Sequence, residues 1–352
     1  MGFQFINDEQ KIRVSLSNRA YITMLEDMSV FDVSTQSAFI NKLIDNYRDS
    51  SIASLTTYLD VIRDSFYSDI FPLEIDSNTK DNISNHFYLV QRKQALEILN
   101  SFMKEKNISK LYHISNSNID FLKHDFEDEE IYKGKPGLYI KCLLEDYASL
   151  PFIKRERIFR KEIYEIVERA CAEKHLLYVK IPIFNERKTI IIYPYKILPD
   201  TLNTQDYLTC YTRFKEESPS EKLSASFSMA RLPMPNILKQ SCFLSKNDIK
   251  SIEEDIQNLS VSFLRGESTE IHVKLSETGK RTYHNKIYSR PTKNVSLSSN
   301  DEYVFFCSEN QAFNYFYSFG PDAEIISPKS LRDRMINSHI NTLKKYTSDI
   351  NN

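Results

Sequence analysis

Basic and aromatic side chains are interleaved over residues 174–242, where they form the clearest chemical signal in the chain. This stretch holds ten Lys and Arg against six Asp and Glu, a net charge of +4, whereas the whole chain of 352 residues carries −2. Proteins bind single-stranded nucleic acids with cationic grooves and with aromatic rings that stack on bases, at about 1–3 kcal/mol per base. The pattern therefore predicts a single-strand nucleic-acid site. The aromatic residues of this predicted site are Tyr178, Tyr193, Tyr195, Tyr207, Tyr211 and Phe214.

One predicted strand, residues 206–214, separates these side chains into two faces. Alternate residues of a strand point to opposite sides, so Tyr207, Tyr211 and Arg213 share a face with Thr209. The other face is more apolar and is the better candidate for the core. We therefore expect Tyr207, Tyr211 and Arg213 to face a ligand, although aromatic residues in small sheets also serve to fill the core. The residues expected in the core are Leu208, Cys210, Thr212 and Phe214.

Residue types that carry catalysis are scattered along the chain. None of the six glycines has the spacing of a phosphate-binding loop. The five cysteines include no CxxC pair, and no two of the seven histidines stand four residues apart. We therefore expect a non-catalytic protein without cofactor or metal. A metal-free nuclease assembled by the fold from scattered His and acidic residues is the enzymatic alternative.

Composition places the chain among globular proteins. Apolar residues make up 41% and charged residues 27%. No apolar run approaches the roughly 18 residues that span a bilayer, and the first ten residues lack the pattern of a signal peptide. The expected location is the cytoplasm, with no membrane partner.

The first fifty residues predict a short strand followed by two helices. Residues 11–17 alternate polar and apolar types, and helical spacing follows over residues 18–30 and again after Ser34 or Thr35. A lone strand cannot bury its apolar face, so we expect it to pair with the same strand of a second chain. The predicted protein is thus a homodimer.

The rest of the chain divides into three further predicted regions. Residues 51–173 are expected to be a helical linker region, 174–242 a small domain of short strands, and 243–352 an α+β unit. Within the linker, residues 154–161 carry a basic cluster that suits either a phosphate clamp or a solvated helix start. Glu156 and Glu162 interrupt its charge and favour the solvated helix.

Residues 9–49 resemble the ribbon-helix-helix family. There, paired strands enter the DNA major groove and alternate polar strand residues read the bases. The resemblance gives this role to Lys11, Arg13 and Ser15, although residues 1–50 sum to a charge of −2. The family's glycine between the helices is replaced here by the stretch around Asp32. The alternative is a module that dimerises without touching DNA.

Residues 150–346 resemble the WYL-domain family. Asp206-Tyr207-Leu208 stands at the position of its Trp-Tyr-Leu signature, Tyr193–Lys196 resembles its proline-centred strand, and Phe227–Leu232 its strand ending in arginine, here Arg231. Residues 315–332 look like the extension that follows WYL domains. The resemblance implies a multi-domain α+β protein with a small Sm/SH3-like barrel and a C-terminal ferredoxin-like unit. It adds Tyr195, Lys196 and Arg231 to the site.

This domain order resembles the WYL accessory proteins of RNA-targeting (type VI-D) CRISPR systems. The resemblance implies a regulator that binds single-stranded RNA, or another nucleic acid, and stimulates a CRISPR effector nuclease. The alternative is a dimeric DNA-binding transcription factor whose WYL domain senses a ligand. The predicted nucleic-acid-binding residues of the WYL-like domain are Lys180, Arg187, Lys188, Tyr195, Lys196, Tyr207, Tyr211, Arg213 and Arg231.

Overall fold

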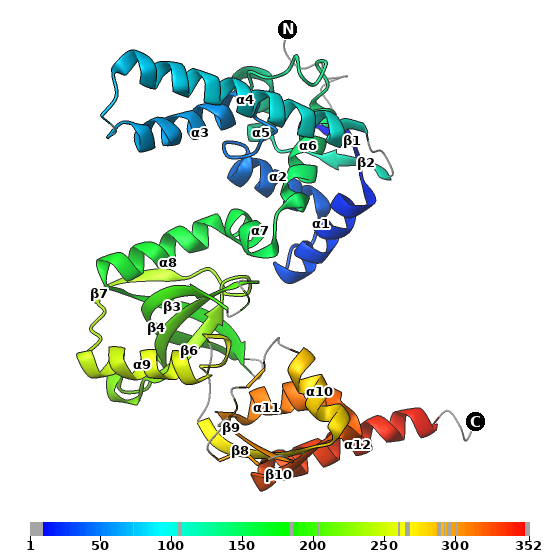
Figure 1. The fold of residues 1–352 in the computed structure, drawn as a ribbon, viewed down its shortest axis with the longest axis vertical. Coiled ribbons are helices and arrows are strands. Elements are labelled where there is room, and N and C mark those ends of the chain that lie inside the picture. Colours follow the sequence, from blue (N-terminus) through cyan, green and yellow to red (C-terminus); the bar gives the residue numbers. More distant parts are fainter. Residues whose placement is uncertain are drawn as a thin grey trace. The chain divides into compact units, whose positions relative to one another are not determined.

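The computed structural model is a mixed α+β protein with three small antiparallel sheets (Figure 1). It describes residues 10–72, 74–104, 108–183, 186–200, 202, 204–259, 261–264, 268–286, 290, 291, 293, 297–299 and 301–348. The chain divides into an N-terminal unit, residues 1–161, and a C-terminal unit, residues 162–352. The expected boundary at residue 50 thus does not separate compact units. Of the helices in the described residues, none is both long and apolar enough to cross a membrane.

The first strand finds its partner within its own chain. β1 (Lys11–Leu16) pairs antiparallel with β2 (Ile108–His113), in a register that joins Lys11 to His113. A Cβ added to Gly137 would lie 2.2 Å from the backbone oxygen of Arg13, so this glycine sits directly against β1. This corrects the expected pairing with a second chain, because β2 of the same chain is the strand that pairs with β1.

Helices of the N-terminal unit pack around one central helix. α6 (Pro136–Ser149) has apolar and polar residues buried on all sides and lies against β1, α1 and α4. Ser17 and Thr35 cap α1 and α2 by accepting bonds from backbone amides. The other helices are α1 (Asn18–Val30), α2 (Gln36–Tyr47), α3 (Leu55–Ile70), α4 (Ser77–Lys104), α5 (Asn116–Asp120), the π-helix η1 (Phe121–Asp125) and α7 (Phe152–Phe159).

Two buried carboxylates connect α1 and α7 to α6. Glu145 accepts bonds of 2.7 Å from both the amide and the hydroxyl of Ser17. Asp27, only 1% exposed, accepts from the Tyr147 hydroxyl at 2.7 Å and from Nε of Arg155 at 2.8 Å. Because buried charges are tolerated only when they are paired and hydrogen-bonded, these contacts fix the helix arrangement.

The C-terminal unit begins with a five-stranded sheet between two helices. The strand order is β6-β5-β4-β3-β7, and all pairs are antiparallel. α8 (Lys161–Glu173) covers one face and α9 (Lys246–Leu259) the other (Figure 1). The strands are β3 (His175–Ile183), β4 (Glu186–Pro199), β5 (Asp206–Phe214), β6 (Leu223–Ser228) and β7 (Asn236–Ser241), with a short 3₁₀ turn η2 (Pro219–Glu221).

This sheet is open, which corrects the expected small barrel. β6 and β7 are its edges, and no pairing between them is present in the described residues. Two helices already bury the two faces, so the sheet needs no closure upon itself to form a core.

A three-stranded sheet forms the remainder of the unit. Its order is β10-β8-β9, from β8 (Ser268–Leu275), β9 (Glu302–Ser308) and β10 (Ala323–Ser327). A ferredoxin-like unit has four strands. The described residues form three, so the structure corrects the expectation of a ferredoxin-like unit. The helical elements here are the 3₁₀ turn η3 (Val261–Phe263), α10 (Glu277–Asn285), α11 (Glu309–Phe316), the 3₁₀ segment η4 (Tyr317–Asp322) and α12 (Lys329–Ser348).

Candidate nucleic-acid interface

The α8 face of the five-stranded sheet is a continuous apolar core. Leu208 and Cys210 are fully buried there against Val167 and Ala170 of α8, as strand periodicity predicts. Asp206 is also fully buried and accepts a 2.9 Å bond from the Tyr164 hydroxyl. This hydrogen bond joins α8 to the first residue of β5.

The opposite face, expected to meet a ligand, is a second core beneath α9. Ile252 of α9 is fully buried in a cluster that includes Tyr193 and Tyr211, each 7% exposed. The Tyr211 hydroxyl donates to the backbone oxygen of Asp248 at 3.0 Å. The structure therefore corrects the expectation for Tyr211, because α9 covers the ring that was to stack on a base.

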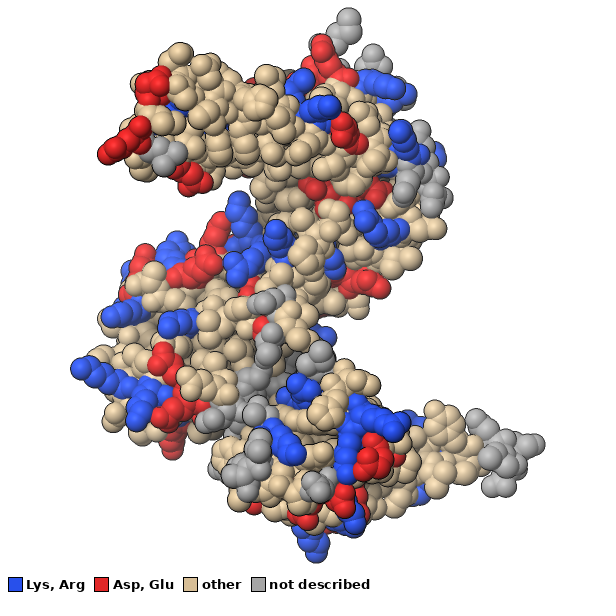
Figure 2. Space-filling model, in the orientation of Figure 1, with Lys and Arg blue, Asp and Glu red and all other residues tan. Residues whose placement is uncertain are grey.

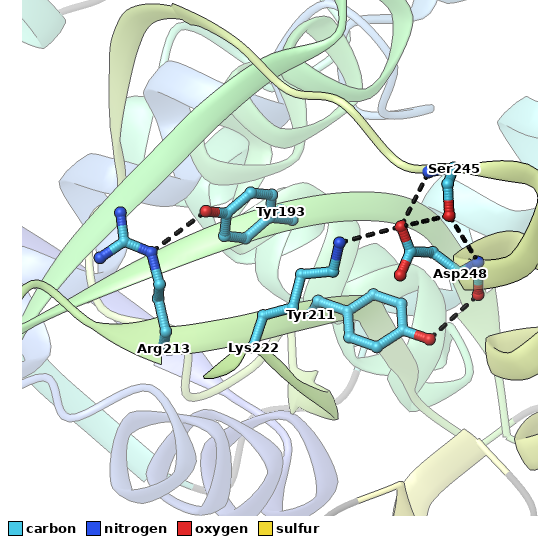
Figure 3. Close-up of polar contacts among 6 residues, drawn as sticks. All are labelled: Tyr193, Tyr211, Arg213, Lys222, Ser245 and Asp248. Atoms are coloured by element: carbon cyan, nitrogen blue, oxygen red, sulfur yellow. Dashed lines mark hydrogen bonds and ion pairs between the residues drawn. The ribbon is translucent and has the colours of Figure 1, made fainter. Parts of the chain in front are cut away.

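Polar contacts hold the start of α9 against this face (Figure 3). Nζ of Lys222 lies 2.9 Å from Oδ2 of Asp248, and the amide and hydroxyl of Ser245 each donate to that oxygen at 2.8 Å. Burial alone would raise the pKa of Asp248, but these hydrogen bonds outweigh it and hold the pKa below the ordinary value. The start of α9 is therefore held by an ionised carboxylate.

Stability at acidic pH should depend on this carboxylate. Because its folded pKa lies below the ordinary 3.8, ionised Asp248 stabilises the fold above that pH, and the contribution is lost as pH falls through the folded value. We expect Asp248→Asn to unfold at lower urea concentration than the wild type at pH 6. The difference between the two urea midpoints should shrink at pH 3. A difference that is constant with pH would contradict the stabilising role of the ionised Asp248.

Four of the predicted cations gather at one end of the sheet. Lys180 of β3 pairs with Thr189 of β4, and the amide of Lys215 bonds the Thr189 oxygen at 3.0 Å, so these three residues form one row. Two rows further along, and therefore on the same face, Ile191 pairs with Arg213. We name this set the hairpin-end cluster: the exposed Lys180, Arg187, Lys188 and Lys215 and the half-buried Arg213.

Within the cluster, Arg213 is held in a fixed position. Its Nε donates to the Tyr193 hydroxyl at 3.1 Å, and Nη1 donates to the backbone oxygens of Phe214 and Glu217 at 3.0 and 2.8 Å. Nζ of Lys188 lies over the ring of Phe214, 5.5 Å from its centroid, which is within the about 6 Å of a cation–π contact. The exposed Glu216 and Glu217 lie in the adjoining turn. The five cations of the cluster outnumber these two carboxylates, so the net charge of this end of the sheet remains positive.

A second group of predicted residues lies at the opposite end of β5. Tyr207 pairs with Leu198 and with Ser228, and the exposed Arg231 follows three residues after Ser228. Six residues separate Tyr207 from Arg213, which corresponds to about 20 Å along a strand. The structure therefore places the predicted site residues at two opposite ends of the sheet, and α9 covers the face of the sheet between them.

Tyr195 and Lys196 occupy a β-bulge in β4. The register shifts between Pro194 and Lys196, which leaves Tyr195 as the extra residue. The half-buried Tyr195 donates its hydroxyl to Glu253 of α9, and Nζ of Lys196 lies 3.9 Å from the same carboxylate. An acidic residue of α9 thus already contacts both side chains.

The β1–β2 ribbon exposes the predicted DNA-reading residues. Lys11 and Arg13 are exposed and Ser15 is half-buried on its outer face, where the Ser15 and Ser109 hydroxyls lie 3.1 Å apart. β2 adds the exposed Leu111 and His113 to that face. One chain therefore builds the two-stranded ribbon that was expected to need two.

Lys215 is the cation of this region that the sequence-based site omits. It continues the β5 face of Arg213 by two residues, and that periodicity is the signal that could have identified it. In the described part of the chain, no group of three or more His, Cys, Asp or Glu is arranged to hold a metal ion.

Fold and surface together define an α+β protein with a helix-covered five-stranded sheet and a cationic sheet end. A crystal structure described as that of a CRISPR Cas-related protein has a similar fold, with a TM-score of 0.71 and 21% identity over 99% of this chain and 98% of that one. Proteasome accessory factor B/C of Arthrobacter aurescens aligns with a TM-score of 0.29 and 11% identity over 95% of this chain and 50% of that one. No family model and no curated protein match the chain.

Proposed function

We propose that the protein is a non-catalytic regulator that binds single-stranded RNA through the hairpin-end cluster. The observation that carries this proposal is the placement of four exposed cations at the same end of the sheet as Arg213, whose guanidinium is fixed by backbone oxygens. Phosphates are bound by such cations, and a preformed arrangement lowers the entropic cost of binding. Tyr207 and Arg231 at the far end of β5 are the second contact in this proposal.

We further propose that the protein acts beside an RNA-targeting CRISPR effector. Support comes from the resemblance of its domain order to WYL accessory proteins. The full-length fold similarity to a protein described as CRISPR Cas-related is consistent with that role. In this proposal, the RNA held by the C-terminal unit is the link to the effector nuclease.

Fluorescence anisotropy with labelled single-stranded RNA, single-stranded DNA and duplex DNA of equal length tests the proposal. Salt must be the same in all three titrations, because phosphate contacts make affinity salt-dependent. We expect single-stranded RNA to bind most tightly. Equal or tighter binding of the duplex would contradict the assignment to the sheet end.

Duplex DNA binding by the β1–β2 ribbon is the second candidate function. It is favoured by one observation, the exposed Lys11 and Arg13 on a complete two-stranded ribbon of the kind that fits a major groove. In that case Arg13→Ala would remove duplex binding and leave RNA binding unchanged. Since β1 is paired within the chain, neither candidate requires a homodimer to complete the strand.

A further inference from the structure

α7 separates its charges between two faces. Arg155 points inward, where Nε and Nη2 contact the two carboxylate oxygens of Asp27 at 2.8 and 3.1 Å. Glu156 is fully buried, and Phe159 beside it is 1% exposed. The glutamate that interrupts the basic cluster in the sequence is therefore absent from the surface of the folded helix.

The outward face of this helix is cationic. Lys154 and Arg157 are exposed and stand three residues apart, the spacing of one helix face, and the exposed Lys161 follows at the start of α8. Lys42 of α2 also contacts α7, with its Nζ 5.0 Å from the centroid of the Phe159 ring. Figure 2 shows Lys and Arg side chains gathered over α7. We name Lys42, Lys154, Arg157, Arg160 and Lys161 the α7 patch.

Acidic residues near the patch do not cancel it. The exposed Asp45 and Glu162 are the nearest in sequence, and with them the set still sums to +3. Helix stability explains part of the arrangement, because cations are favourable in the last turn, where Arg157 lies. It does not explain Lys154 in the first turn, where the helix dipole disfavours a cation.

We propose that the α7 patch is a further contact for the backbone of single-stranded RNA, distinct from the hairpin-end cluster and from Tyr207 and Arg231. This inference rests on the proposed function. The patch offers exposed point charges and an exposed guanidinium, and the described side chains on this outward face include no aromatic ring, so it binds phosphates and does not read bases.

A salt titration of RNA binding tests the patch. The variant Lys154→Ala/Arg157→Ala/Lys161→Ala removes three exposed cations, and each lost phosphate contact lowers the slope of log affinity against log salt by about 0.7 for a single strand. We expect the slope to fall by about 2, with a loss of affinity of more than about tenfold at low salt. The loss should be the same for RNAs of different sequence.

The matched control is Arg92→Ala/Lys93→Ala/Lys104→Ala on α4, which removes the same charge from exposed positions of the same unit. It should leave the slope unchanged, and thermal unfolding should show both variants folded. A slope equal in the patch variant and the control would overturn the inference. Absence of RNA binding by the wild type would instead overturn the proposed function, so the two failures are distinguishable.

Discussion

Arg155→Ala is expected to destabilise the N-terminal unit by about 3–5 kcal/mol, because it leaves a buried carboxylate without its cation. The Asp27 side chain is 2% exposed and that of Arg155 14% exposed, and two nitrogens of the guanidinium contact Asp27. The Tyr147 hydroxyl would remain as a neutral donor to Asp27. Chemical denaturation followed by circular dichroism measures the loss.

The matched control is Arg157→Ala, two residues away on the outward face of α7. It removes the same side chain from an exposed position and should change stability by less than about 0.5 kcal/mol. Equal losses in the two variants would contradict the stabilising role of the Arg155–Asp27 contact. The two arginines should also differ in RNA binding, where only the exposed one is expected to contribute.

A large loss of RNA affinity is expected for Lys180→Ala/Arg187→Ala/Lys188→Ala. These three exposed cations lie at the same end of the sheet as the fixed Arg213, and their removal should weaken binding by more than about tenfold at moderate salt. Anisotropy titrations with a single-stranded RNA provide the measurement. The fold should be unaffected, since each side chain is exposed.

The control for this triple variant is Lys246→Ala/Lys250→Ala/Lys344→Ala, which carries the same change of charge on exposed positions of α9 and α12. If both variants lost affinity equally, binding would depend on net charge and not on the hairpin-end cluster. Retained affinity in the first variant would move the binding site away from this end of the sheet.

Local periodicity predicts the individual elements well. The alternation of β1 is observed in its burial, the helix expected over residues 18–30 has those bounds, and so does the strand over 206–214. These features depend on neighbouring residues only. They need no knowledge of what packs against them.

The pairing of strands and the covering of sheet faces by helices were harder to predict, because they depend on distant parts of the chain. β2 has the sequence ISKLYH, in which polar residues obscure the apolar alternation that would mark it as the partner of β1. Tyr211 lies on the less apolar face of β5, and only α9 makes that face a core. The spacing of Ile249, Ile252 and Ile256 does indicate an apolar stripe on α9, which requires a surface to cover.

The pairing of β1 with β2 also has a consequence for the order of events during synthesis. Ser15 faces Ser109, 94 positions later in the chain. At the usual rate of about 5–20 residues per second, the ribosome takes roughly 5–20 s to reach that point. Throughout this interval the first strand has two unpaired edges, and charged residues on such edges oppose wrong pairing. We therefore expect Lys11 and Arg13 to oppose association of the nascent chain with its neighbours, whatever they contact once it has folded.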